Sequence, residues 1–350
     1  MKIIERYKIW FLVSTLIIIP GIISLFVWGL NLGIDFAGGT LIELSFGNQE
    51  INELTATLDP EQESQEIKEG ELEEPAGEAD TSLEPEDAEV ENENKDEIGG
   101  VEIIKITKKQ IRDIFEENEI SNPQISLIDD HTFLARAHLI DIEKYRELKN
   151  SFDKKIGENK ELRYETVGPT ISKDLIRKAI IALSLAIIAI VLYIAWAFRS
   201  VPKPMSSWKF GLSAIVALVH DVLIIVGLFS ILGHFLHVEI DNLFITALLT
   251  TLGFSVHDTI VVFDRVRENI KTTSGDFTYI ANKSIAETIT RSLNTSATTL
   301  FTLLALLVFG GQSIFWFVFA LIVGIIAGTY SSIFIATVVL VLWHKKVKKA

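Results

Sequence analysis

The sequence contains no cysteine. Disulfide bonds and thiolate sites for metals or redox chemistry are therefore excluded, and any extracytoplasmic domain must fold without covalent cross-links. The sequence also lacks a phosphate-binding loop, a metal-ligand cluster and a nucleophile triad pattern. We expect no enzyme activity, no cofactor and no bound metal.

An overall excess of positive charge is also missing, since the formal net charge is −14. Much of the acidity is local, because 18 of the 46 acidic residues but only 2 of the 32 basic ones lie between positions 59 and 97. The rest of the chain carries 30 basic and 28 acidic residues. It has no basic footprint for nucleic acid, and we expect no nucleic-acid partner.

Hydrophobic residues are abundant, at 49% of the chain with a mean hydropathy of +0.35. They fall in runs of roughly twenty residues, the length that crosses a hydrocarbon core of about 30 Å. The six runs cover positions 9–30, 175–198, 209–232, 242–263, 292–309 and 314–343. The predicted fold class is a membrane all-α protein with six transmembrane helices and one α+β domain between the first two.

Basic residues indicate how these helices are oriented. Lys and Arg concentrate before the first run, in the loops near 199–209 and 265–283, and at 345–349, whereas the loops at 234–241 and 310–313 have none. The first run is longer than a signal-peptide core and ends without a small-x-small cleavage pattern, so we expect an uncleaved helix. The predicted protein is a multi-pass protein of the cytoplasmic membrane with both termini cytoplasmic.

The polar region between the first two runs alternates strands and helices in the order strand, helix, strand, strand, helix, strand. The expected elements lie at 40–46, 107–118, 124–128, 132–137, 141–155 and 161–167. This order predicts a ferredoxin-like α+β domain on the extracytoplasmic side. The acidic stretch at about 48–99 interrupts it and is predicted to be disordered, because it has too few apolar residues to offset the entropy of ordering. The expected domains are 1–30, 31–172 and 173–350.

Ionisable residues inside the apolar runs are the candidate functional residues, because a charge within a bilayer costs several kcal/mol. Asp258 lies roughly 26 Å of helix from one end of the fourth run, and Arg291 lies roughly 28 Å from the matching end of the fifth. We therefore expect the two to pair at one depth as a proton relay. Asp221 is a second protonatable candidate, and the alternative for each carboxyl is a purely structural link between helices. His220 and His257 are possible modulators, or only hydrogen bonders between helices.

Several glycines are expected to shape the backbone. Gly324 and Gly328 form a small-xxx-small pair that favours close helix packing. Gly33, Gly38 and Gly39 permit a tight path after the first helix. Asp35 between them is interpreted as a turn residue rather than a chemical group.

Five motifs in order resemble one family. They are GIDFAGGT at 33–40, VGPTISKDL at 167–175, ALVHDVLI at 217–224, GFSVHDTIVVFDRVREN at 253–269 and SIAETITRSLNTSATTL at 284–300. The sequence resembles the SecF family, the smaller partner of SecD in bacterial protein export, related to the proton-driven resistance-nodulation-division transporters. Two departures are His257, where the family pattern usually has Asn, and the long acidic insertion.

The resemblance implies a subunit that works with SecD to couple the proton gradient to late steps of protein export. It implies hinges at Leu30–Gly39 and Gly168–Lys173, which include Gly33, Asp35, Gly38, Gly39 and Pro169. The implied partners are SecD, the SecYEG channel, accessory proteins of the YajC or YidC type, and the translocating polypeptide. Two alternatives stay open, a stand-alone proton-coupled exporter of lipids or small molecules and a passive scaffold of the translocon.

Overall fold

The computed structural model describes residues 2–46, 51–52, 106–129, 131–199 and 206–349. The chain divides into two compact units, Met1–Gly38 with Val167–Ala350, and Gly39–Thr166. We call these the membrane unit and the soluble unit. The soluble unit is shorter at both ends than the predicted domain of 31–172. The predicted insertion at about 48–99 lies outside the described residues, except for positions 51 and 52.

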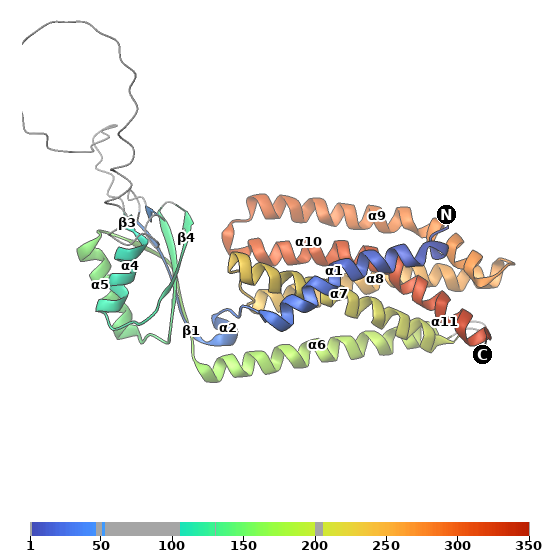
Figure 1. Ribbon diagram of the computed structural model, residues 1–350, viewed down its shortest axis with the longest axis horizontal. Helices are drawn as coiled ribbons and strands as arrows, with labels where there is room; N and C mark the ends of the chain where they lie inside the picture. The colour runs from blue at the N-terminus through green and yellow to red at the C-terminus, as the bar shows by residue number, and fades with distance from the viewer. Residues whose placement is uncertain (1, 47–50, 53–105, 130, 200–205, 350) are drawn as a thin grey trace, which may run out of the picture. The chain divides into compact units, whose positions relative to one another are not determined.

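The soluble unit is built on a four-stranded sheet with strand order β4-β5-β1-β6. Antiparallel ladders join β1 to β5 and β4 to β5, and α4 and α5 cover one face of the sheet (Figure 1). The predicted ferredoxin-like order is confirmed. The elements are β1 (Gly39–Ser45), α4 (Lys108–Glu117), β4 (Gln124–Asp129), β5 (Thr132–Ala137), α5 (Ile142–Lys155) and β6 (Lys160–Val167).

A second, two-stranded sheet lies beside the first helix of this unit. Its strands β2 (Ile51–Asn52) and β3 (Ile106–Thr107) pair in parallel. The first of these strands lies inside the predicted bounds of the insertion, near its start. A two-residue ladder is too short to leave a periodic signal in the sequence.

Four phenylalanines form the centre of the soluble unit's core. Phe46, Phe115, Phe133 and Phe152 come from strands and helices on both sides of the insertion, and each is at most 1% exposed. Their rings contact one another at centroid distances of 5.5–6.5 Å. Burial of this aromatic surface holds the helices onto the sheet without a disulfide.

Tyr145 gives the soluble unit a predicted dependence on alkaline pH. Its hydroxyl donates to Glu161, and its ring stacks on Tyr164 at 4.1 Å. Burial first, and then the Glu161 carboxylate, raise the pKa of Tyr145. The unfolded chain ionises at about pH 10 while the folded unit stays neutral, so this stabilisation is full below about pH 10 and is lost above it. Tyr145→Phe should cost about 1–2 kcal/mol at neutral pH and make the alkaline loss smaller.

Pulse proteolysis in urea, at neutral pH and at about pH 11, measures this difference. A Tyr145→Phe variant that loses as much stability at high pH as the native protein would contradict the assignment.

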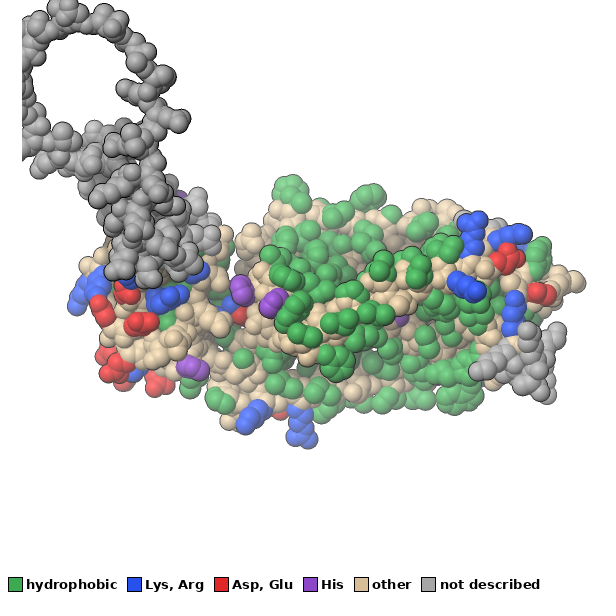
Figure 2. Space-filling model, in the orientation of Figure 1, with side chains coloured by type: hydrophobic (Ala, Val, Ile, Leu, Met, Phe, Trp, Pro, Cys, Tyr) green, Lys and Arg blue, Asp and Glu red, His purple; other side chains and the backbone are tan. Residues whose placement is uncertain are grey.

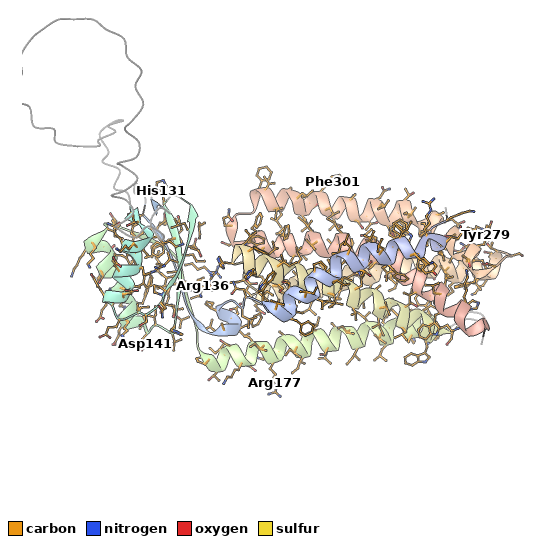
Figure 3. The ribbon with its side chains drawn as sticks, viewed as in Figure 1. His131, Arg136, Asp141, Arg177, Tyr279 and Phe301 are labelled. Carbon is orange, nitrogen blue, oxygen red and sulfur yellow. The ribbon has the colours of Figure 1, made fainter. Side chains whose placement is uncertain are left out.

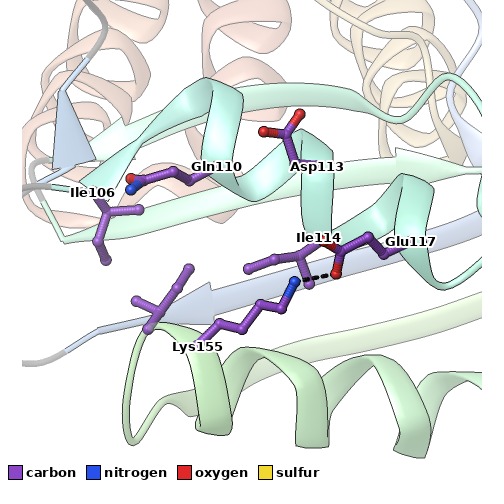
Figure 4. Close-up of a pocket in the computed structure, with 7 residues that line it drawn as sticks. Ile106, Gln110, Asp113, Ile114, Glu117 and Lys155 are labelled. Carbon is purple, nitrogen blue, oxygen red and sulfur yellow. Dashed lines mark hydrogen bonds and ion pairs between the residues drawn. The ribbon is translucent and has the colours of Figure 1, made fainter.

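A groove of about 340 Å³ opens between α4, α5 and β3 (Figure 4). Ile106, Ile114 and Ile156 supply apolar lining, and Glu117 forms an ion pair with Lys155 at its rim. The remaining lining side chains, Gln110 and Asp113, are polar. The groove therefore combines apolar and charged surface.

Six helices of the described chain are long and apolar enough to cross a membrane, which confirms the predicted number. Each helix extends beyond its predicted run at one end or both, and the extension is longest in α8 and α9, where polar turns continue the helix past the apolar stretch. The helices are α1 (Tyr7–Val27, preceded by η1, Ile4–Arg6), α6 (Pro169–Ala197), α7 (Ser207–Leu236), α8 (Asn242–Thr272), α9 (Phe277–Phe309) and α10 (Gln312–Ser331), which continues through the π-helical turn η2 (Ser332–Ala336) into α11 (Thr337–Lys349). The short helix α2 (Ile34–Ala37) follows α1.

Apolar side chains cover the outer surface of the long helices (Figure 2). Leu16, Leu192 and Phe309 are 75%, 62% and 86% exposed, and Phe301 projects away from α9 (Figure 3). Such surface suits a hydrocarbon environment, in which backbone polar groups must be satisfied within helices. The polar side chains therefore turn to the interior of the bundle.

Close backbone contact fixes α1 against α7. A Cβ atom on Gly227 would lie 2.7 Å from the Cα of Gly21. Ser24 and Ser230 hydrogen-bond 2.7 Å apart further along the same crossing. Small residues at this crossing let two apolar helices approach without a cavity.

Candidate functional site

Asp258 lies on α8 within the interior of the membrane unit and is 1% exposed. Its Oδ2 atom accepts long hydrogen bonds from Ser296 on α9, at 3.4 Å, and from Thr329 on α10, at 3.3 Å. These distances exceed the usual range for hydroxyl donors. The carboxyl group is therefore enclosed by three helices but only weakly bonded.

The donors around Asp258 have competing acceptors. Ser296 and Thr329 lie 2.6 Å from each other, and Thr329 also donates to the carbonyl of Ile325 at 2.9 Å. Each hydroxyl has one proton to give, so two protons serve more than two acceptors. A carboxyl group supplied so poorly with donors can also be accommodated as the neutral acid, which itself donates to a hydroxyl oxygen.

His257 is exposed beside Asp258, and Arg291 does not form the predicted pair with Asp258. The imidazole of His257 is 60% exposed, with its Nδ1 atom 3.9 Å from Oδ1 of Asp258. The Arg291 side chain is exposed on α9, and no ion pair among the described residues joins it to Asp258. The expected Asp258–Arg291 pair is wrong for this conformation. The sequence argument matched the depths of the two residues along their helices. It did not give their directions, and Asp258 faces the interior of the bundle whereas Arg291 is on the outward side of α9.

Asp221 and His220 on α7 form a second buried pair, 2% and 6% exposed. The Nδ1 atom of His220 lies 3.0 Å from Oδ1 of Asp221. The other carboxylate oxygen accepts from Ser255 on α8 at 2.6 Å and from Ser331 on α10 at 2.8 Å. Asp221 is thus well supplied with donors, in contrast to Asp258.

His220 also links this pair to α1. Its Nε2 atom lies 2.9 Å from the hydroxyl of Ser14, which is 3.3 Å from the hydroxyl of Tyr330. Tyr330 in turn donates to the carbonyl of Trp10 at 2.8 Å. If Nδ1 donates to Asp221, then Nε2 accepts from Ser14. The order serine, histidine, aspartate resembles a nucleophile triad. Ser14 is only 5% exposed, so its hydroxyl is closed to a substrate. The three hydrogen-bonded groups are instead suited to holding or passing a proton.

A π-helical turn begins beside both carboxyl groups. Ser331 donates to Asp221, and the next residue, Ser332, hydrogen-bonds Thr259 at 2.8 Å and the carbonyl of Ser255 at 3.1 Å. Such turns carry a locally widened hydrogen-bond ladder and recur at functional sites. At the start of this turn two consecutive hydroxyls bond different helices, Ser331 to Asp221 on α7 and Ser332 to residues of α8.

Gly324 and Gly328 lie where α10 passes α8. A Cβ atom on Gly328 would lie 2.8 Å from the Cβ of Ser255, and one on Gly324 would overlap Thr251. Larger side chains at these glycines would separate the two helices. The hydroxyls that reach Asp221 and Asp258 depend on this short separation.

The predicted hinge residues are placed at both crossings between the units. Gly38 and Gly39 have φ angles of 78° and 131°, which favour glycine. Gly168 precedes α6, and Pro169 is its first residue, where a missing N–H costs nothing. Gly33 instead lies in a segment that is bonded to the helix bundle.

Asp35 makes a contact to a distant helix that the turn interpretation did not include. Its Oδ2 atom accepts from the backbone N–H of Asn242, the first residue of α8, at 2.9 Å. The GIDF pattern gave no signal for this contact, because the two residues are 207 positions apart.

Hydroxyl residues around the two carboxyl groups were also missed. Ser14, Thr329 and Ser331 lie outside the five motifs, and Ser296 lies inside the motif at 284–300 but was not singled out. A signal was available in part, since Ser255 lies three residues before Asp258, at the spacing that places two side chains on one helix face, and both are buried. Among the described residues, no group of His and carboxylates could hold a metal ion.

The fold and the site define a multi-pass membrane protein with buried carboxyl groups at the centre of a six-helix unit and one ferredoxin-like soluble unit. Two family models match the chain. Residues 147–346 match "Protein export membrane protein SecD/SecF, C-terminal", and residues 23–50 match "SecD/SecF GG Motif". The chain belongs to the SecD/SecF family.

Relatives agree with this assignment over nearly the whole chain. The chain is 40% identical to the protein translocase subunit SecF of Thermobaculum terrenum, covering 97% of this chain and 93% of the relative. It is 34% identical to the SecF of Anaerolinea thermophila, covering 98% and 94%. In the SecDF of Bacillus subtilis it is 32% identical over 99% of its own length but only 38% of that protein.

A solved structure shares the fold. The crystal structure of SecDF, a translocon-associated membrane protein from Thermus thermophilus, superposes with a TM-score of 0.71 at 29% identity. The match covers 99% of this chain and 39% of the SecDF chain. The region of the Thermus SecDF that resembles this chain is therefore one part of that longer polypeptide.

Proposed function

We propose that the chain is a SecF-like subunit that works with SecD and couples the proton gradient to protein export across the cytoplasmic membrane. The family membership and the names of its relatives support the export role. The observation that carries the proton role is Asp258, which is buried within the membrane unit and held only by two long hydroxyl contacts. A stand-alone exporter has no such support from the relatives.

Asp258 is proposed to take up and release one proton in each cycle. Water access from one side ionises the group, whereas enclosure favours the neutral acid, because an isolated buried charge is costly. Asp221, His220 and the hydroxyls beside them are proposed as a second proton-holding group. Ser255, which donates to Asp221, lies one turn from Asp258 on the same helix. A change at either carboxyl therefore reaches the other through α8.

The proton cycle is proposed to move the soluble unit. The chain crosses between the units at Gly38–Gly39 and at Thr166–Val167, so rotation about these few residues is the available freedom. One proton crossing about 100 mV releases about 2.3 kcal/mol. That shifts a two-state equilibrium about fiftyfold.

The partner is proposed to cover the outward face of α8 and α9. His257 on α8 and Arg291 and Asn294 on α9 are exposed within the two membrane-spanning helices. A guanidinium or amide facing hydrocarbon is costly, so such residues normally face protein or water. SecD is the proposed partner, supported by relatives in which both parts form one SecDF polypeptide. Contacts with the SecYEG channel, YajC-type or YidC-type proteins and the translocating polypeptide follow from the export role.

The orientation of the chain gives a separate prediction. Because the chain has no native cysteine, a single cysteine at Ser121 in the soluble unit or at Ser274 between α8 and α9 can be labelled cleanly. The positive-inside rule predicts that an impermeant thiol reagent added outside the cell labels Ser121→Cys but not Ser274→Cys. Both positions are exposed, so membrane rupture should make them equally reactive. The reverse pattern in intact cells would contradict the proposed topology.

A further inference from the structure

The segment that leads from α1 to the soluble unit is fastened to the loop between α7 and α8. The backbone N–H of Gly33 donates to the carbonyl of Ile240 at 2.9 Å, and Ile240 N–H donates to Asn31 at 2.8 Å. A side chain on Gly33 would press against Glu239 and Ile240. This part of the predicted hinge is therefore held in place.

Phe36 strengthens the attachment by packing into the bundle. Its side chain is 7% exposed and belongs to the cluster that contains Phe229, Ile240 and Phe244. Gly29, before α2, has a φ angle of 73°, but its N–H donates to Leu25 and its carbonyl accepts from Ser230. The next φ angle that favours glycine comes two residues after Phe36, at Gly38. Rotational freedom in this connection thus starts after α2, and α2 itself moves with the bundle.

Asp35 connects α2 to the start of α8. The first N–H groups of a helix have no partner within the helix, and here two carboxylates serve them. Asp35 accepts from Asn242 at 2.9 Å, and Asp241 accepts from Phe244 at 2.9 Å. Only Asp35 comes from another element, and from Asn242 an unbroken helix of about 24 Å leads to Asp258.

We propose that Asp35 is a positioning residue that couples the root of the soluble unit to α8, so that displacement of α8 during the proton cycle is transmitted through the Asn242 N–H to α2 and then to the soluble unit. This inference rests on the proposed function. Asp35 does not touch the reacting carboxyl group, and its role is mechanical.

The bond can be removed from either side. Asp35→Ala deletes the acceptor, and Asn242→Pro deletes the donor at the first helical position, where proline is well tolerated. Asp241 has an extended conformation, with φ −117° and ψ −171°, which suits a residue before proline. Both variants should lower gradient-dependent export about tenfold, roughly the effect of losing one charged cap. The double variant should be no worse than either single variant.

Two comparisons separate coupling from helix stability. Asp35→Asn keeps an oxygen acceptor and should restore most of the export. Asp241→Ala removes a cap of the same helix without touching the link to α2, and should export like the native protein. Equal losses from Asp241→Ala and Asp35→Ala would overturn the proposal, and so would normal export by Asn242→Pro.

A distance reporter distinguishes this proposal from the proposed function. Fluorophores at Ser121→Cys and Ser274→Cys are followed in the complex with a cysteine-free SecD in lipid vesicles while a proton gradient is imposed. We expect the distance to change in the native background and to stay constant with Asp35→Ala or Asn242→Pro. A native-like change in these variants overturns the coupling role alone. No change in the native background overturns the proposed function and the coupling role with it.

Discussion

Asp258→Asn is expected to reduce export to the level seen without a proton gradient while the complex with SecD still assembles. The amide has nearly the shape of the neutral acid but cannot release a proton, so the site is held in one state. The lost driving force is about 2.3 kcal/mol for each proton at about 100 mV. Export of a secreted reporter, with and without an uncoupler, measures the effect in cells where the variant replaces the native chain.

Asp264→Asn is the matched control. Asp264 lies on the same helix, but it is exposed and forms an ion pair with Arg267 at 2.7 Å. Exposed pairs of this kind contribute little, about 0–1 kcal/mol, so export and its sensitivity to the uncoupler should stay normal. Full gradient-dependent export by Asp258→Asn would leave only the structural role for this carboxyl group.

Arg291→Met is expected to reduce gradient-dependent export about as strongly as Asp258→Asn, but for a different reason. Because Arg291 is exposed and not paired with Asp258 in this conformation, its charge is available to the proposed partner or to a later state of the cycle. Loss of the charge should abolish gradient-dependent export and weaken co-purification with SecD. Arg291→Lys should recover only part of both, since an ammonium group lacks the planar fork of a guanidinium.

Arg177→Met provides the control for Arg291. Arg177 is exposed near the start of α6 and points away from the bundle (Figure 3). Its removal changes the same number of charges without touching the α8–α9 face. Export by Arg291→Met at the level of Arg177→Met would show that the position of the charge is unimportant.

The architecture was largely predictable because each element leaves a local periodic signal. Apolar runs predicted six membrane helices, and alternation predicted the strands that form the ferredoxin-like sheet. The limits of α9 were less clear, since its first turns from Phe277 are polar. Asp276 caps the helix by accepting from the N–H of Tyr279 at 3.1 Å, and this cap is a short-range signal of the true start.

The partners of the buried groups were harder to predict, because sequence gives the depth of a residue but not its direction around the helix. The dipeptide His-Asp occurs on α7 and again on α8. On α7 both residues are buried, whereas on α8 His257 is exposed and Asp258 is not. One residue turns a helix by about 100°, so small differences in rotation decide such outcomes. The contacts of His220 with Ser14 and of Asp35 with Asn242 join residues more than 200 positions apart.

The most direct test follows the distance between the two units in single molecules of the native complex and of Asp258→Asn. Labels at Ser121→Cys and Ser274→Cys report this distance as a proton gradient is applied across the vesicle membrane. The account predicts that the native complex redistributes between two distances when the gradient is imposed, and that Asp258→Asn keeps one distance with or without it. An Asp258→Asn complex that responds to the gradient as the native complex does would contradict the claim that protonation of Asp258 drives the soluble unit.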